Sequence, residues 1–437
     1  MAHTTLKSGY GSLVERLNRA PQGAPQSDRL FQILKMLFTQ GEAALVSALP
    51  IRPFTTETAA SIWKMKPSYA QKILDKLADK AILVDMEAED KTFYVLPPPM
   101  AGFFEFSLMR VRGDMDQKAL AELFYAYLNG EEAFIRDLFA QGQTQLGRVF
   151  VQEAALTPAN YAVVLDYERA TAVIQAASAI AIGTCYCRHK MQHVGRDCNA
   201  PKEICMTFNT SAKYLVRHNH AKASTAAQTL ELLHAAWEGG LVQFGDNVRE
   251  GVNFICNCCA CCCEAMIAAR KFSMLSPVHT TNFLPELDRA LCTDCGKCVA
   301  ACPVEAMTLV SANDPNHPKR KTVKLFEQVC LGCGVCARSC PVGAISLAPR
   351  GERVITPLNT AHRTVLMAIE RGKLQHLILD NRLMENHRAL AAILGVILRL
   401  PPIKQILATK QFRSRYIEMI LSKKPYLIKH PKARTKR

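Results

Sequence analysis

A short cysteine motif occurs twice in this chain and constrains its fold more than any other feature. The first copy runs from Cys292 to Pro303 and the second, 38 residues later, from Cys330 to Pro341; each reads C-x2-C-x2-C-x3-C-P. Three thiols separated by two intervening residues can fold around one face of an iron-sulfur cubane, while the proline after the fourth turns that thiol away. The fourth cysteine of each motif is therefore predicted to bind the cluster of the other motif.

This spacing predicts two ligand sets for two [4Fe-4S] clusters that lie side by side. The first set is Cys292, Cys295, Cys298 and Cys340, and the second set is Cys330, Cys333, Cys336 and Cys302. A zinc ribbon is the alternative, because paired C-x2-C motifs also bind zinc. Zinc sites do not need four cysteines per motif with a following proline, so the iron-sulfur interpretation is preferred.

With these motifs, the segment from Asn282 to Ala348 resembles the bacterial-type two-cluster ferredoxin family. The offset of 38 also superposes Gly296 on Gly334, which indicates an internal duplication. The resemblance implies a ferredoxin-like domain that transfers single electrons. The connection between the two halves, residues 311–324, is longer than the family's pattern and is interpreted as a solvated insertion.

A second group of cysteines lies upstream of the two motifs. Its ten members are Cys185, Cys187, Cys198, Cys205, Cys256, Cys258, Cys259, Cys261, Cys262 and Cys263. Thiolates in this number select iron-sulfur clusters, zinc or Cu(I). Adjacent side chains point in different directions, so the run from Cys256 to Cys263 cannot all serve one metal. One or two further iron-sulfur centres are favoured, zinc held by four of the ten is the alternative, and the subset of ligands is left open.

The arrangement C-x-C-R-H followed by C-N-C-C-x-C-C-C resembles uncharacterised iron-sulfur proteins of anaerobic microbes. That resemblance implies anaerobic metabolism but supplies no reaction. Arg188 and His189 follow the first of these motifs directly. A cation there could raise the potential of a cluster or hold an anionic substrate, although such residues are more often solvated or paired.

Cysteine usage and charge indicate the compartment and the partners. All 18 cysteines lie between Cys185 and Cys340, and the chain starts without an apolar signal segment, so we expect reduced thiols in the cytoplasm.

The net charge is +16, and residues 399–437 hold twelve Lys and Arg against one acid. This basic tail could serve an acidic redox partner, an anionic membrane surface or nucleic acid. The uncharged run 389–398 is about half the length that a bilayer-spanning helix needs.

Periodicity and composition predict an α+β multidomain chain with a mostly helical cysteine-rich middle. The predicted divisions are a mobile leader (1–27), a winged-helix-like module (28–98), a helical segment (99–180), the cysteine-rich block (181–281), the ferredoxin domain (282–349) and a helical basic C-terminal region (350–437). Within the module we expect helices near 30–38, 55–64 and 67–80, then a hairpin from 81–86 and 92–96. A capping box at Thr225 and Gln228 predicts a helix over 225–237.

A winged helix would place its third helix in a DNA major groove. The side chains available for this are Lys66, Gln71, Lys72 and Lys76, while the hairpin carries the acids Asp85, Glu87, Glu89 and Asp90. Negative charge on the hairpin opposes phosphate contact, so protein docking or a structural role is preferred to DNA binding.

The sequence therefore predicts an iron-sulfur electron-transfer protein, more an electron carrier or oxidoreductase subunit than a stand-alone enzyme. No G-x-G-x-x-G or G-x-x-x-x-G-K-[ST] occurs in the chain, so a separate redox partner is expected to supply nicotinamide or flavin chemistry. Two alternatives are a redox-responsive DNA-binding regulator and a reductase whose substrate binds at the block 185–263.

Overall fold

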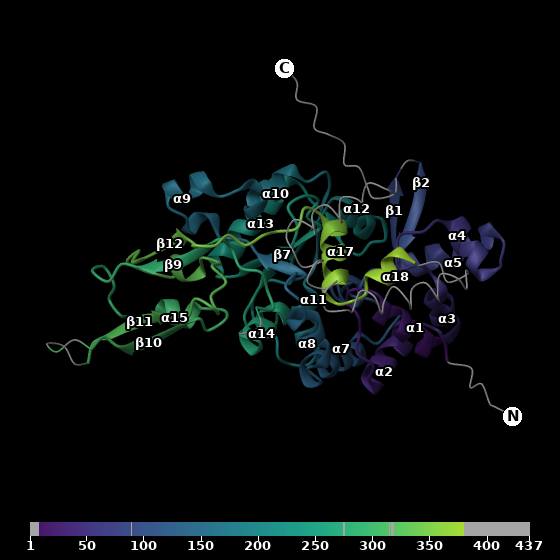
Figure 1. Cartoon of the computed structure of the whole chain (residues 1–437), viewed down its shortest axis with the longest axis horizontal. Helices are drawn as coiled ribbons and strands as arrows, with labels where there is room; N and C mark the ends of the chain where they lie inside the picture. The colour runs from purple at the N-terminus through teal and green to yellow at the C-terminus, as the bar shows by residue number, and fades with distance from the viewer. Residues whose placement is uncertain (1–7, 89, 274–275, 314, 316–318, 380–437) are drawn as a thin grey trace, which may run out of the picture.

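Three regions follow one another along the long axis of the molecule (Figure 1). The computed structural model describes residues 8–88, 90–273, 276–313, 315 and 319–379. A repeat domain (residues 282–349) lies at one end, a six-stranded sheet at the centre, and the N-terminal helices at the other end. The mixture of helix and sheet confirms the α+β class.

The N-terminal module contains the helices and the hairpin that the sequence predicts. Its elements are α2 (Asp28–Leu37), α3 (Gln40–Ala48), α4 (Thr56–Trp63), α5 (Pro67–Asp79), β1 (Val84–Ala88) and β2 (Lys91–Val95). Pro67 occupies the first turn of α5, where its missing N–H costs nothing. The sequence did not indicate α3, which begins with a capping box between Thr39 and Glu42. Whether the module belongs to the winged-helix family stays a prediction.

The structure corrects the prediction of a mobile leader for residues 8–27, while residues 1–7 lie outside the described residues. Helix α1 (Gly9–Arg19) buries Leu13, Val14 and Leu17 against the module. Arg16 donates from Nε to the carbonyl oxygen of Leu49 at 3.1 Å. The glycines, prolines and serines on either side obscured this apolar stripe in the sequence.

The segment 99–180 is mainly helical, as predicted, with many of its aromatic side chains in the core. Its elements are η1 (Pro99–Phe103), α6 (Phe104–Phe106), α7 (Gln117–Tyr125), η2 (Ala126–Gly130), α8 (Ala133–Ala140), β3 (Gly147–Val149), η3 (Glu153–Ala155), α9 (Pro158–Val163), η4 (Asp166–Glu168) and α10 (Ala170–Ala176). Phe103, Phe104 and Phe124 are fully buried. Ring contacts join them, which fixes the packing of this layer.

The cysteine-rich middle is not mostly helical, which corrects the prediction. It contributes five strands to an antiparallel sheet of order β3-β7-β8-β5-β4-β6. The elements are β4 (Ile180–Thr184), α11 (Tyr186–His193), β5 (Glu203–Phe208), α12 (Asn209–Arg217), β6 (Lys222–Ala223), α13 (Ala226–Glu238), β7 (Val242–Asp246), β8 (Phe254–Cys258) and α14 (Glu264–Lys271). Most of these strands are short and carry cysteine or glycine, which weakens their alternation pattern. The predicted helix with its capping box is confirmed as α13.

The two faces of the sheet have different chemistry because side chains alternate along each strand. Ile180, Met206 and Ile255 point to one face, where they form a core with α10 and α13. The opposite face therefore receives Cys205 and Cys256, the residues that follow or precede them in β5 and β8.

The repeat domain consists of two hairpin-like strand pairs and two short helices. Its elements are β9 (Phe283–Leu287), α15 (Lys297–Ala301), β10 (Met307–Ser311), β11 (Lys321–Leu325), α16 (Val335–Arg338) and β12 (Ile345–Pro349). Strand β9 pairs with β12, and β10 pairs with β11. The long connection between the halves thus contains the last residue of β10 and most of β11.

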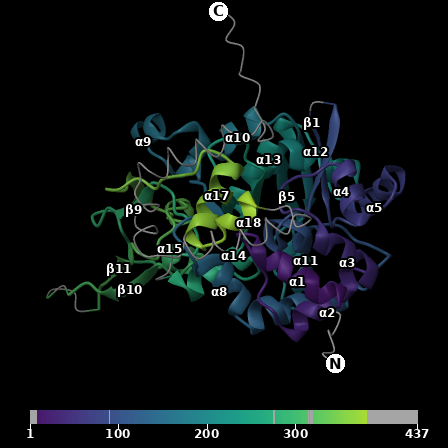
Figure 2. The same ribbon diagram turned by 45° about the vertical axis from the view of Figure 1, so that its right-hand side comes forward.

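Two helices after the repeat domain, α17 (Thr360–Glu370) and α18 (Leu374–Ile378), lie across the centre of the molecule (Figure 2). Arg363 of α17 pairs with Asp246 of β7, and Lys373 donates to the carbonyl oxygen of Ala20 at 2.9 Å. They therefore tie the sheet to α1. The predictions for residues 389–398 and for the basic tail lie outside the described residues. Among the helices that the structure describes, none is both long and apolar enough to cross a bilayer.

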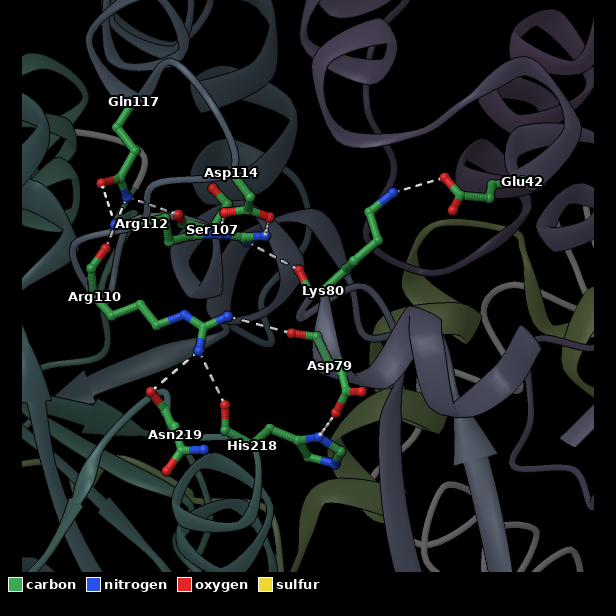
Figure 3. A network of polar contacts seen from close by, with 10 residues as sticks. All are labelled: Glu42, Asp79, Lys80, Ser107, Arg110, Arg112, Asp114, Gln117, His218 and Asn219. Carbon is green, nitrogen blue, oxygen red and sulfur yellow. Dashed lines mark hydrogen bonds and ion pairs between the residues drawn. The ribbon is translucent and has the colours of Figure 1, made fainter. Parts of the chain in front are cut away.

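A polar network joins the N-terminal module to the sheet region (Figure 3). Arg110 donates to the carbonyl oxygens of Asp79, His218 and Asn219. These guanidinium contacts satisfy carbonyls at the C-terminal ends of α5 and α12, where positive charge is favourable. His218 adds a contact between its Nδ1 and Asp79 at 2.6 Å and one between its Nε2 and Asp85 at 3.0 Å.

We expect this junction to weaken as the pH rises. The hydrogen bond with Asp85, followed by the one with Asp79, raises the pKa of His218 above its usual value of about 6.5. A raised pKa in the folded state gives stability that is complete below the unfolded value and is lost as the pH rises through the folded value. His218→Ala should therefore lower the free energy of unfolding by about 1 kcal/mol near pH 6 and by less near pH 9.

Denaturant unfolding of the full chain at both pH values checks this. His234→Ala, which changes an exposed histidine on α13, is the control and should not alter the pH dependence. Equal losses at both pH values in His218→Ala would contradict the assignment.

Candidate iron-sulfur and thiol sites

The duplication seen in the sequence is repeated in the backbone conformation. The left-handed region is occupied by Asp294, Gly296 and Glu305 in the first half. In the second half it is occupied by Gly332, Gly334 and Gly343, each 38 residues further on. Three matched turns of this kind indicate that both motifs wrap their thiols in the same way.

Backbone N–H groups donate to the same sulfurs in both halves. Cys302 Sγ accepts from the N–H of Ala306 at 3.2 Å, and Cys340 Sγ accepts from that of Ala344 at 3.2 Å. The first cysteines match as well, since Cys292 and Cys330 each accept from the N–H two residues on at 3.4 Å. Such bonds stabilise the negative charge that a thiolate ligand carries.

The crossed ligand sets stay a prediction, and the interactions between the thiols bear on it. Burial raises the pKa of Cys336, and the sulfurs of Cys333, Cys330 and Cys302 raise it further. Burial is also the largest cause of the raised pKa of Cys330, and Cys302 again contributes. The fourth cysteine of the first motif therefore lies with the thiols of the second.

The other thiol group shows the complementary relation. Burial raises the pKa of Cys292, with Asp294 and Cys340 adding to the rise. The pKa of Cys298 is raised by burial and then by Cys292 and Cys295. The fourth cysteine of the second motif thus lies with the thiols of the first.

The two motifs differ in how they sit on the rest of the protein. A Cβ at Gly332 would stand 2.1 Å from the carbonyl oxygen of Phe283, while the equivalent residue in the first motif is Asp294. The backbone N–H of Gln152 donates to the carbonyl oxygen of Cys333 at 2.9 Å. Cys295, in contrast, is exposed. The second motif is packed against the body of the protein, and the first faces solvent.

Comparison with known proteins identifies this region. A family model described as the 4Fe-4S dicluster domain matches residues 291–344. This part of the chain is a ferredoxin-type 4Fe-4S domain. No curated protein and no solved structure matches the chain significantly. The dicluster domain covers a minority of the chain, so the upstream cysteines need a separate argument.

The thiols of the dicluster domain fit the clusters that the family binds. The N–H···S bonds and the left-handed turns repeat between the halves. When bound, a [4Fe-4S] cluster accepts and releases one electron at a time. What the chain supplies is thiols in two matched motifs, with Cys330, Cys333 and Cys336 buried and Cys295 exposed.

The ten upstream cysteines form two groups in the structure. The first group, called here the six-thiol set, is Cys185, Cys187, Cys205, Cys256, Cys258 and Cys263. The second, called here the four-thiol set, is Cys198, Cys259, Cys261 and Cys262. The run Cys256 to Cys263 is thus divided equally between the two sets.

The sheet brings half of the six-thiol set together. Cys256 and Cys258 are two residues apart in β8 and so share a face. The pairing of Met206 with Ile255 puts Cys205 of β5 opposite Cys256. Three sulfurs therefore meet on the face away from α10 and α13.

Two helix N-termini supply the other three sulfurs. Cys185 is the N-cap of α11 and Cys187 lies in its first turn, while Cys263 is the N-cap of α14. Lys190 of α11 forms a buried ion pair with Glu264 of α14, which holds the two helix starts side by side. The partial positive charge at a helix N-terminus favours the thiolate form.

The thiols of the six-thiol set contact one another in turn. Cys263 and Cys258 are 3.1 Å apart between their sulfurs. Hydrogen bonds from the thiols of Cys187 and Cys258 lower the pKa of Cys263 to about 6. The contact with Cys256 raises the pKa of Cys205. The order of contacts is Cys185, Cys187, Cys263, Cys258, Cys256 and Cys205. Six convergent thiols exceed the four that a single cubane takes.

An acid that the sequence analysis missed lies beside the six-thiol set. Burial raises the pKa of Glu105 well above its usual range, and the charges of Cys256 and Cys185 add to this. Its Oε2 accepts the N–H of Gly102 at 2.9 Å. A single acid inside the aromatic run Phe103 to Phe106 was the available signal, because a buried carboxyl usually has a specific role.

Arg188 and His189 are both buried and hydrogen-bonded, which favours the structural interpretation of these residues. Arg188 donates to the carbonyl oxygens of Pro201 and Asn257, each at 2.7 Å. Burial opposes its charge, but the sulfurs of Cys185 and Cys259 outweigh this and raise its pKa. His189 Nδ1 lies 2.7 Å from the carbonyl oxygen of Leu108. Arg188 thus lies between the two thiol sets as a fixed cation.

The dicluster domain and the six-thiol set share one hydrophobic core. That core includes Cys330 and Cys333 together with Cys258 and Cys263. Gln152, which is fully buried, binds Cys333 through its backbone and donates from its side chain to the carbonyl oxygen of Leu241 at 2.9 Å. Leu241 precedes Val242, which pairs with Cys258. Gln152 therefore connects the second motif to the strand pair of β7 and β8.

If each fourth cysteine binds the cluster of the other motif, variants that disrupt the same cluster should give the same residual spectrum. Cys302→Ser and Cys333→Ser should each disrupt the same buried cluster and leave the same reduced paramagnetic resonance spectrum. Cys340→Ser and Cys295→Ser should share a different residual spectrum, from the other cluster. The measurement is electron paramagnetic resonance of the four anaerobically reduced variants. If Cys302→Ser instead matched Cys295→Ser, each motif would hold its own fourth ligand and the crossed assignment would fail.

Proposed function

We propose that this protein is an iron-sulfur electron-transfer protein in which the dicluster domain exchanges single electrons with a further iron-sulfur centre at the six-thiol set. The observation that carries the proposal is the bridge through Gln152, whose backbone N–H donates to the carbonyl oxygen of Cys333 and whose side chain donates to that of Leu241, next to the strand pair that holds Cys258. Gln152 is fully buried, and a path of low dielectric constant lowers the charge reorganisation that accompanies electron exchange. Two crossed [4Fe-4S] sites in the dicluster domain follow from the paired thiol groups.

The two motifs of the dicluster domain differ in solvent exposure, and this difference indicates where a redox partner docks. The first motif faces solvent at the end of the molecule, with Cys295 exposed and Leu291 53% exposed. The second motif is buried against the sheet. A partner that reaches Cys295 would lie nearest to one cluster, and the six-thiol set nearest to the other.

Iron content tests the further centre. The dicluster domain alone accounts for about 8 iron atoms per chain, so an excess places iron in the upstream block. The double variant Cys187→Ser and Cys258→Ser should lose only that excess and keep the iron of the dicluster domain. Anaerobic purification followed by iron and sulfide analysis measures both amounts.

Cys295→Ser is the matched control, since it should lower the iron of the dicluster domain and leave the excess in place. Wild-type protein with about 8 iron atoms and no excess would contradict the centre at the six-thiol set while leaving the dicluster domain intact.

Contacts of the hairpin argue against the regulator alternative. Arg217 of α12 pairs with Asp85 and Glu87, so the hairpin of the N-terminal module packs on the sheet region with these two acids in ion pairs. Gln71 of α5 is held by Tyr94 and Asp75. Gel-shift experiments at several salt concentrations should show no sequence-selective retention of DNA. The reductase alternative stays a prediction, and Glu105 is the acid that would hold a proton for it.

A further inference from the structure

The four-thiol set has a geometry unlike that of the other cysteines. The sulfurs of Cys198, Cys259, Cys261 and Cys262 all lie within 4.8 Å of one another. Cys261 and Cys262 are 3.5 Å apart, and Cys262 and Cys198 are 3.9 Å apart. Among the described residues, no other group of three or more cysteine, histidine or acidic side chains has its ligand atoms this close together.

These distances distinguish a single ion from a cluster. Four thiolates at about 2.3 Å from one tetrahedral zinc ion lie about 3.8 Å from each other. A cubane holds each thiolate on its own iron, which keeps the sulfurs further apart. The thiols of the dicluster domain, which fit cubanes, do not form a group as tight as this one within the described chain.

We propose that the four-thiol set binds one tetrahedral zinc ion. Zinc has no redox chemistry and prefers closed sites of four thiolates, so this centre would be structural and would take no part in electron transfer. The proposal concerns residues outside the six-thiol set and does not depend on the proposed function.

The segments that carry the four thiols are already held together by Arg188. Cys198 lies in the loop after α11, and the other three thiols lie in the turn between β8 and α14. Arg188 binds Pro201 of the first segment and Asn257 of the second through its two terminal nitrogens. It also contacts the sulfur of Cys259. A zinc ion with four thiolates has a net charge of about −2, which this guanidinium partly offsets.

The ion would hold the turn that orients the six-thiol set. Cys262 is fully buried and Cys261 is exposed, so the site lies at the edge of the sheet region. Cys258 precedes the turn and Cys263 follows it. Fixing the turn at Cys259, Cys261 and Cys262 therefore fixes where the chain leaves and re-enters the six-thiol set.

Metal analysis of the full chain, produced with both zinc and iron supplied, tests the proposal. Wild-type protein should contain about one zinc ion per chain. Cys261→Ser and Cys198→Ser should each lower zinc content roughly tenfold, while the iron of the dicluster domain, about 8 atoms per chain, stays in place. Because Cys261 is exposed, its variant should fold even if that of Cys198 does not.

Cys295→Ser is the matched control, and it should lower the iron of the dicluster domain while keeping zinc. A second measurement replaces zinc with Co²⁺, whose absorption spectrum reports four thiolates in a tetrahedron, and Cys261→Ser should lose that spectrum. Unchanged zinc content in Cys261→Ser, a mononuclear iron signal from this site, or wild-type protein without zinc would each overturn the proposal. Those results leave the iron count of the dicluster domain unaffected, so the two proposals fail separately.

Discussion

The alternation of side chains along β8 is the constraint on which the sites of this protein depend. It places Ile255 in the apolar core under α13 and turns Cys256 and Cys258 to the opposite face. A shift of the register by one residue would turn the thiols of Cys256 and Cys258 into the apolar core and Ile255 toward the face that carries the thiols. The pairing with β5 and β7 prevents this, because it is fixed on both edges of the strand. The sheet is thus the scaffold that makes thiol convergence possible.

The two halves of the dicluster domain differ where the second half packs against the body of the protein. Both halves use the same left-handed turns and the same N–H···S bonds. The second half needs glycine at 332, since Phe283 leaves no room for a side chain there. The first half faces solvent and has Asp294 at that position. The motif chemistry is the same in both copies, and position 332 is one where packing against the body of the protein requires a different residue.

Sequence patterns predicted some elements well because their signals are local. The capping box at Thr225 and the proline that opens α5 are read within one helical turn, and both helices are present. The mostly helical middle was a wrong prediction, since β4, β5, β7 and β8 are only five or six residues long. Their sheet forms by pairing distant segments, and the sequence does not record that pairing. The leader was misjudged for a related reason, because α1 is stable only through its packing on the module.

The sequence by itself determined the two-cluster motif, and it predicted the crossing of its fourth cysteines and that the run from Cys256 to Cys263 serves more than one site. Motif spacing carries this information, since a few intervening residues limit where each thiol can reach. Only the tertiary structure decided which of the ten upstream thiols share a site, and that Glu105 and Gln152 lie next to them. Those neighbours come from strands and helices far apart in the chain, and contact between them depends on sheet register and helix packing, which no local pattern specifies.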